Sequence, residues 1–138
     1  MTHARGILRL ACLTAAFALA TTAVQAQTEQ SATQFYMAYR AAFAKATKID
    51  ELMPFMAKAR RAEIEKTPAG ERSKMFAFIK ELDTIAQIKV IKETKSGNGV
   101  TLSAEGIDGD KKKSTGTIEV VREDGGWKLG KESWSTKG

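Results

Sequence analysis

The chain has 138 residues, a formal net charge of +6 at pH 7, one cysteine and one histidine. This length suits one ordinary domain and is too short for two. The cysteine and the histidine, Cys12 and His3, both lie near the N-terminus. Everything after residue 12 therefore lacks the side chains that form disulfides, cysteine nucleophiles, histidine bases and the usual zinc or copper sites.

The first 26 residues predict a secretory signal peptide. Arg5 and Arg9 precede an apolar run from Leu10 to Ala20, and the small-residue motif Val24-Gln25-Ala26 follows. A basic start, a short apolar run and a small-residue exit are the three parts of such a signal. The run is too short to span a bilayer stably, so we expect no stable membrane anchor. We expect cleavage near Ala26, a mature chain of 112 residues from Gln27 to residue 138, and a periplasmic or secreted location.

Cleavage would also change the charge that a partner meets. It removes two arginines and no acid, which lowers the net charge from +6 to +4. A modest positive charge favours anionic partners, but lysines spread along the whole chain are typical of a solvated surface. For an exported protein we expect no nucleic-acid partner. Asp108-Gly109-Asp110 resembles the opening of a calcium loop, yet three lysines follow and the required glutamate is missing. We expect a turn there, and no metal or cofactor.

Helical patterns occupy about residues 31–83. Ser31 is placed to cap a first helix. Pro54 interrupts the second region and predicts a short helix before it and a longer one after it. A breaker at Thr67 to Arg72 precedes a third amphipathic helix. The apolar stripe of the first helix consists of Phe35, Tyr39, Ala42, Phe43 and Ala46, and that of the third consists of Met75, Phe76, Ile79 and Leu82.

From Ala86 the apolar period changes from 3.6 to 2, which predicts an antiparallel meander of four strands over about residues 86–135. Turn signals separate the strands at Asn98-Gly99, at Asp108-Gly109 and in the EDGG segment. The inward positions that we expect carry no acid: Ile88, Val90, Val100, Leu102, Ile118 and Val120. Helices followed by strands predict one α+β domain over residues 27–138, with N-terminal helices packed on a curved four-stranded antiparallel sheet.

Two segments carry a resemblance to a known family: FYMAYRAAFAKATKIDEL in the first helical region and GTIEVVREDGGWKLGKESW at the end. They resemble the aromatic-rich opening helix and the last hairpin of the nuclear transport factor 2-like superfamily, a cone-shaped α+β fold. The similarity covers about residues 32 to 135. It is nearest to small secreted or lipoprotein-type bacterial members, most of them of uncharacterised function.

The resemblance implies roles for the two tryptophans. Trp127 and Leu129 would face the helices, with the indole closing the wide end of the core and its N–H reaching a partner. Trp134 has the opposite parity. A bulge near Gly130 would return it to the core face, which is the interpretation we favour, whereas an unbulged strand would leave it outside for a partner to cover.

The resemblance also bears on chemistry. Tyr36 and Tyr39 are similar in position to the tyrosine that donates a hydrogen bond to an oxyanion in the family's steroid isomerases. Our expected inward strand positions offer no base to complete such a site. The leading hypothesis is an exported, non-catalytic domain that binds a small apolar molecule or a protein partner, in the cone cavity or on the outer sheet face.

The cavity candidates are aromatic and methionine residues: Phe35, Tyr36, Tyr39, Phe43, Met53, Met56, Phe76 and Trp127. These side chains would otherwise simply fill the core of a small domain. Trp134 is the candidate for contact with a protein partner. The alternatives are an inhibitor or immunity-type protein that blocks a partner, a homodimer formed through the sheet face, and a small isomerase-like enzyme.

Overall fold

The computed structural model describes residues 29–137, so the predicted signal peptide, Gln27, Cys12 and His3 lie outside the described residues. Four helices precede four strands, which confirms the α+β class. The helices are α1 (Ala32–Lys45), the 3-10 helix η1 (Ile49–Phe55), α2 (Lys58–Glu65) and α3 (Ala69–Leu82). The strands are β1 (Ala86–Ser96), β2 (Gly99–Ile107), β3 (Lys113–Glu123) and β4 (Gly126–Thr136).

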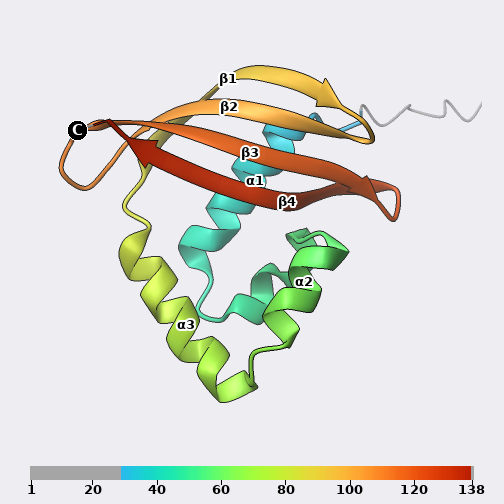
Figure 1. Cartoon of the computed structure of the whole chain (residues 1–138), viewed down its shortest axis with the longest axis vertical. Helices are drawn as coiled ribbons and strands as arrows, with labels where there is room; N and C mark the ends of the chain where they lie inside the picture. The colour runs from blue at the N-terminus through green and yellow to red at the C-terminus, as the bar shows by residue number, and fades with distance from the viewer. Residues whose placement is uncertain (1–28, 138) are drawn as a thin grey trace, which may run out of the picture.

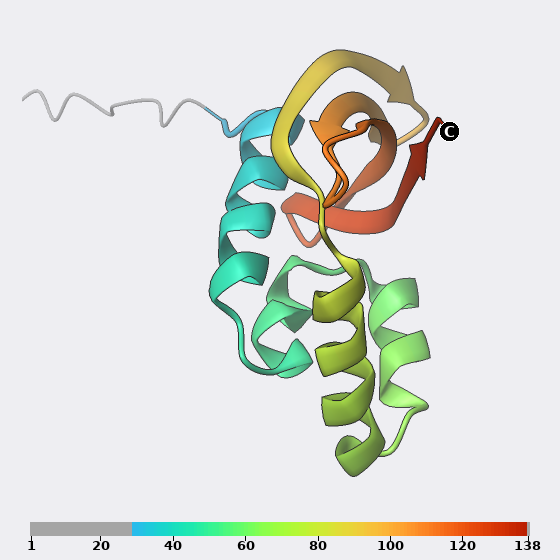
Figure 2. The same cartoon turned by 90° about the vertical axis from the view of Figure 1, so that its left-hand side faces the viewer.

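The strands form the predicted antiparallel meander, in the order β1-β2-β3-β4. Figure 1 shows α1 behind the sheet, against one face, while α2 and α3 lie beyond the β4 edge. The strands are strongly bent (Figure 2). We call the face toward α1 the inner face. This arrangement leaves a region beside β4 that is bounded by sheet on one side and by helices on the others.

Helix α1 begins where the sequence predicts. Ser31 accepts a hydrogen bond from the Gln34 backbone N–H, and the Gln34 side chain accepts one from the Ser31 N–H, which is a complete capping box. Glu93 of β1 accepts a further bond from the Thr33 N–H at 3.0 Å. A carboxylate near a helix N-terminus is favourable because it offsets the partial positive charge there. The start of α1 is thereby joined to the sheet.

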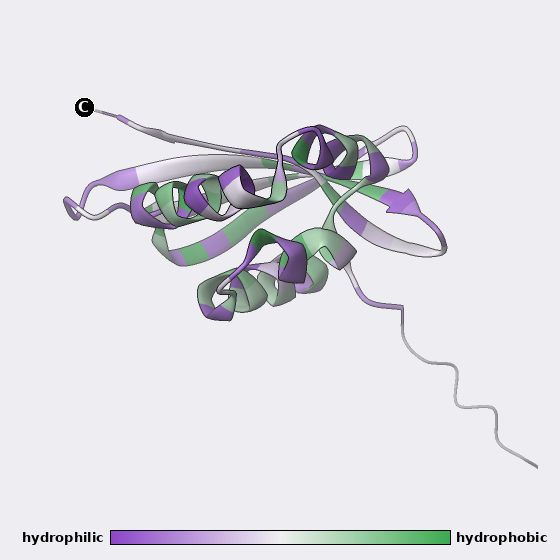
Figure 3. Cartoon of the chain, turned by 90° about the horizontal axis from the view of Figure 1, so that it is seen from below, coloured by the Kyte–Doolittle hydropathy of each residue, from purple (hydrophilic) through white to green (hydrophobic). Residues whose placement is uncertain are grey.

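The core lies between α1 and the inner face. Hydrophobic and hydrophilic residues alternate along the strands (Figure 3), as a half-buried sheet requires. Four predicted inward residues, Val100, Leu102, Ile118 and Val120, are buried, whereas Ile88 and Val90 on the edge strand β1 are half-buried. The buried core residues of the helices include Phe35, Tyr36, Tyr39, Phe43, Leu52, Met56 and Phe76.

The helices after α1 differ from expectation in two ways. The short helix η1 contains Pro54 and ends at Phe55, and α2 begins only at Lys58. The predicted breaker at Thr67 to Arg72 is wrong in its second half, because α3 begins at Ala69. Pro68 stands directly before that helix, where its missing N–H costs no hydrogen bond.

The predicted apolar face of α3 is only partly buried, which is a second correction. Phe76 is buried, but Ile79 and Leu82 are 38% and 63% exposed. The reason is that α3 lies beyond the sheet edge, so no strand covers this part of the helix (Figure 1).

Two tight turns shape the hairpins. The first loop is Gly97-Asn98 and not the expected Asn98-Gly99, because Ser96 pairs with Gly99 and the positive φ of +56° falls on Gly97. The last turn uses Asp124 and Gly125, with φ of 52° and 76°. Positive φ at both central residues is the geometry of the hairpin turn that matches strand twist. The EDGG prediction is thereby confirmed.

The predicted bulge at Gly130 is present. Glu119 pairs with Lys131 and Val120 with Leu129, so Gly130 is the extra residue in β4. Beyond it, Trp134 pairs with Gly116 on the inner face, where a Cβ on Gly116 would come within 2.9 Å of three indole carbons. The backbone of β3 therefore lies flat against one face of the Trp134 ring, and only glycine allows this approach.

Trp127 occupies the other end of β4. It is half-buried against the core, and its indole N–H donates to the Gln30 carbonyl at 2.8 Å, as expected of a tryptophan that needs a partner for its N–H. The Arg122 guanidinium lies 4.0 Å from the ring centroid. Trp127 thus closes the core near the start of α1.

The two edge strands of the sheet, β1 and β4, differ in their regularity and in what covers them. Within residues 29–137, β1 pairs with β2 alone, and its ladder is interrupted twice, between Ala86 and Lys89 and between Val90 and Lys92. At the β4 edge the Ala57 N–H donates to the Leu129 carbonyl at 2.9 Å, so the chain between η1 and α2 covers the middle of β4.

Candidate functional site

Two adjoining cavities lie beside β4. The outer cavity, of about 450 Å³, is bounded by α1, α3, β4 and the turn after β2. The inner cavity, of about 160 Å³, lies among the four helices. They share Tyr39, Phe43, Arg60 and Ile79. The two cavities therefore adjoin at these four side chains.

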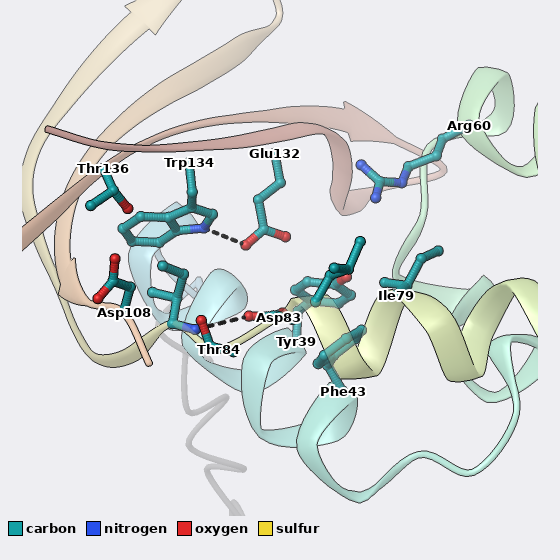
Figure 4. A pocket seen from close by; sticks show the side chains of 12 residues that line it. Tyr39, Phe43, Arg60, Ile79, Asp83, Thr84, Asp108, Glu132, Trp134 and Thr136 are labelled. Carbon is teal, nitrogen blue, oxygen red and sulfur yellow. Dashed lines mark hydrogen bonds between the residues drawn. The ribbon is translucent and has the colours of Figure 1, made fainter. Parts of the chain in front are cut away.

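The two linings differ in chemistry. The inner cavity is otherwise lined by Ile49, Leu52, Met56, Ile64, Met75 and Phe76, all apolar. The outer cavity adds polar and apolar groups from several elements: Leu82, Asp83, Thr84, Ile85, Asp108, Glu132, Trp134 and Thr136 (Figure 4). Ligand sites commonly combine an apolar lining with a few placed polar groups.

Glu132 is the central polar residue of the outer cavity, placed on the inner face by the Gly130 bulge. Its Oε1 accepts three hydrogen bonds, from the Tyr36 hydroxyl at 2.7 Å, the Trp134 indole N–H at 2.9 Å and the Arg40 guanidinium at 3.2 Å. Its other oxygen points away from the indole (Figure 4) and bonds to none of residues 29–137. The expectation that no acid faces the helices is wrong, because the bulge gives Glu132 the same orientation as Trp134.

Arg40 links Glu132 to the end of α3. Its two terminal nitrogens donate to both oxygens of Asp83, at 2.6 and 3.0 Å, in addition to the bond to Glu132. All three side chains are between 11% and 17% exposed. One guanidinium thus faces two carboxylates, and the cluster carries an excess negative charge of one.

Burial and charge act in opposite directions on Arg40. Burial alone would lower the pKa of the Arg40 guanidinium, but the hydrogen bond to Asp83 and the charges of Glu132 and Asp83 raise that pKa overall. Arg40 therefore stays charged. Burial raises the pKa of the Tyr36 hydroxyl well above its ordinary value, and the Glu132 charge adds to the increase. Tyr36 is held as a neutral donor to Glu132.

Tyr39 and Arg60 are the polar groups at the junction of the cavities. Tyr39 is only 3% exposed, yet its hydroxyl forms no hydrogen bond with any residue from 29 to 137. Arg60, on α2, likewise forms no ion pair within the described part of the chain, and its guanidinium points toward the cavity (Figure 4). Both groups can bind a ligand without breaking an existing bond.

Asp108 lies at the far end of the outer cavity. Its Oδ1 accepts bonds from the Lys112 and Asp110 backbone N–H groups, at 2.8 and 3.0 Å. The bond from Lys112 lowers the pKa of the Asp108 carboxyl, and that from Asp110 adds to the effect. Asp108 thus forms the predicted turn. Residues 29–137 contain no group of three or more acidic, histidine or cysteine side chains suited to a metal ion.

No family model, curated protein or solved structure matches this chain. The nuclear transport factor 2-like resemblance therefore stays a prediction. Among the described residues, no helix has the length and apolar character needed to cross a membrane.

The predicted cavity residues fall into two groups. Tyr39 and Phe43 line both cavities, and Met56 and Phe76 line the inner one. Trp134, expected to contact a protein partner, instead lines the outer cavity. The candidates that line neither cavity are Phe35, Tyr36, Met53 and Trp127. Tyr36 still acts on the site, through its bond to Glu132.

Sequence reasoning missed Arg60, Asp83 and Glu132. A signal existed for Glu132, since any bulge that turns Trp134 inward also turns Glu132 inward. No local signal existed for Asp83 or Arg60. Asp83 meets Arg40 across 43 positions of sequence. Arg60 stands among other charged residues in α2, a pattern that is typical of a solvated surface.

The two buried tyrosines predict that the stability of the protein falls at alkaline pH. The chain has two tyrosines, Tyr36 and Tyr39, and an ordinary tyrosine ionises near pH 10. Burial, then the Glu132 charge, raises the pKa of Tyr39 to about 12. The unfolded chain therefore releases this proton first, so the free energy of unfolding should fall as pH rises from about 10 toward 12.

Denaturant melts at several alkaline pH values, with phenolate absorbance recorded in parallel, test this expectation. The folded protein should show no phenolate signal at about pH 10, and Tyr39→Phe should reduce the dependence of stability on pH. Phenolate absorbance at that pH with the fold intact would contradict the burial of both rings.

Proposed function

We propose that this chain is an exported, non-catalytic protein that binds a small amphipathic molecule in the two cavities. The apolar part of the ligand would occupy the inner cavity and the polar part the outer one. The observation that carries the proposal is Tyr39, whose side chain lines both cavities and whose hydroxyl bonds to no described residue. A donor beside a cavity that has no partner on the protein can bond to a ligand acceptor without the loss of an existing protein bond.

An isomerase-like enzyme is the second candidate, favoured by the presence of Glu132 beside Tyr36 and Tyr39. The geometry supports it less well than binding. The Tyr36 hydroxyl is fully buried and donates to Glu132, so it is not available to a substrate oxyanion. A ligand that binds in deuterated water and keeps its carbon-bound protons would support binding alone, whereas catalysed exchange would favour the enzyme.

The outer sheet face gives less support to a protein partner or a homodimer. Its central positions are polar: Thr101, Ser103, Glu105, Thr115, Thr117, Glu119, Lys131, Ser133 and Ser135. The cores of stable interfaces are usually apolar and poor in charged residues. Trp134, which could have anchored an inhibitory contact, packs on Gly116 and lines the outer cavity.

Phenylpropanol, an uncharged molecule with an aromatic ring and one hydroxyl, tests the proposed function. We expect it to bind saturably and to shift the NMR signal of the Trp134 indole N–H. Ile64→Phe should abolish binding by filling the inner cavity, while the matched change Ile64→Val should preserve it. A folded parent protein that binds neither phenylpropanol nor a charged analogue of it, with a carboxylate, an ammonium group or both, would refute the proposal.

Export is the part of the proposal that rests on sequence alone. Intact-mass measurement of the protein from its own source should give the mass of residues 27–138, allowing for cyclisation of Gln27. A mass that retains the first 26 residues would contradict it.

A further inference from the structure

The polar groups around the cavity junction indicate which class of ligand the site takes. Three of them have unused bonding capacity within the described residues: the Arg60 guanidinium, the Tyr39 hydroxyl and Glu132 Oε2. Arg60 and Tyr39 can donate to an anionic oxygen, whereas Glu132 Oε2 can only accept. The site therefore offers donors on one side and an acceptor on the other.

The charges have the same arrangement. Arg40 is the ion-pair partner of both Asp83 and Glu132 among residues 29–137, so these three groups together carry one excess negative charge. Arg60 supplies a positive charge at the junction and pairs with no acid of the described chain. The charges of Glu132 and Arg60 shift the pKa of the Tyr39 hydroxyl in opposite directions. A ligand that carries only one charge would be attracted by one side and repelled by the other.

The inner cavity limits the apolar part of the ligand. Its volume is about 160 Å³ and its own lining is aliphatic and aromatic. In another protein, an engineered apolar cavity of about 150 Å³ binds benzene. A phenyl ring or a branched four-carbon group therefore fits, and a long acyl chain does not.

Building on the proposed function, we propose that the ligand is a zwitterionic α-amino acid with a large apolar side chain. Its carboxylate would accept bonds from Arg60 and the Tyr39 hydroxyl, and its ammonium group would donate to Glu132 Oε2. Its side chain would enter the inner cavity. Bonds between ionised partners are about twice as strong as neutral ones, which makes both ends of the ligand contribute to affinity.

Calorimetric titration of the intact protein with five related compounds tests the proposal. Phenylalanine carries both charges, phenylpropanoate only the carboxylate, phenylethylamine only the ammonium group and phenylpropanol neither, while glycine lacks the side chain. We expect phenylalanine to bind at least tenfold more tightly than each of the others. Equal or tighter binding of any other compound in the set would overturn the proposal.

Two variants test which protein group binds each charged end of the ligand. Arg60→Gln should weaken phenylalanine and phenylpropanoate about tenfold, as expected for loss of a charged bond, and should not weaken phenylethylamine, which Arg60 repels. Glu132→Gln should weaken phenylalanine and phenylethylamine and should not weaken phenylpropanoate, which Glu132 repels. Because Glu132→Gln also alters the Tyr36 and Arg40 contacts, Arg60→Gln is decisive if that variant does not fold. An Arg60→Gln protein with unchanged phenylalanine affinity would refute the assignment.

The two proposals fail in different ways. If phenylpropanol binds as tightly as phenylalanine, the cavities are still a ligand site, but the proposal of a zwitterionic ligand is refuted. If the protein binds neither phenylpropanol nor any of the charged phenyl compounds, both the ligand site and the zwitterionic ligand are refuted.

Discussion

Arg40→Met should destabilise the protein by about 3–5 kcal/mol, the usual cost of removing one partner from a buried ion pair. Asp83 and Glu132 would remain largely buried, at 17% and 11% exposure, with no ion-pair partner left among residues 29–137. The Ile85 carbonyl would also lose its bond from Arg40. Methionine keeps most of the packing volume, so the loss should come from charge. Urea denaturation of parent and variant at pH 7 measures it.

Arg60→Met is the matched control, because this arginine lines the same cavity without an ion pair in the described residues. It should change the free energy of unfolding by less than about 1 kcal/mol. Adding Asp83→Asn and Glu132→Gln to Arg40→Met should recover much of the lost free energy of unfolding, because the two unpaired carboxylates are then replaced by neutral amides. A triple variant no more stable than Arg40→Met would show that packing, not charge, is what Arg40 provides.

Gly116→Ala should destabilise the protein by about 1–3 kcal/mol, the usual cost of adding a group to a well-packed core. A Cβ on Gly116 would come within 2.9 Å of three Trp134 indole carbons, so the ring would have to move. That movement would also disturb the bond that Glu132 accepts from the indole N–H. Circular dichroism melts of the variant check the expectation.

Gly130→Ala is the matched control, because it makes the same substitution at a glycine of the neighbouring strand that does not contact the Trp134 ring. Gly130 is not in the positive-φ region, and a Cβ there would lie 3.3 Å from the Glu119 carbonyl oxygen. A small adjustment accommodates it, so we expect a cost of about 1 kcal/mol or less. A Gly116→Ala variant as stable as Gly130→Ala would contradict the packing of the Trp134 ring on the β3 backbone.

The features that sequence predicts correctly are those that neighbouring residues determine. The Ser31 cap needs only Gln34, and the last hairpin needs only Asp124 and Gly125. Alternation along β2 and β3 identifies their buried faces because the side-chain period of a strand is fixed. The bulge at Gly130 is predictable for the same reason, since a glycine within the strand coincides with a change of parity.

The features that sequence misses depend on where elements lie in space. The apolar residues of α3 predict a buried face, yet Ile79 and Leu82 are exposed because the helix extends past the sheet edge. Helical periodicity shows that a face is apolar but not which surface covers it. The ion pair of Arg40 with Asp83 likewise depends on the whole fold, because it forms only where α1 and the end of α3 lie close together.

The two interruptions in β1 bear on how this molecule avoids its own aggregation. An edge strand with a regular row of free N–H and C=O groups is a template for pairing with another chain. In β1 the ladder is broken on either side of Lys89, and Lys92 and Lys95 add charge along the same strand. Irregular, lysine-rich edges discourage strand addition. We therefore expect the sheet to stop at four strands even at high concentration, despite the exposed Ile91 on this edge.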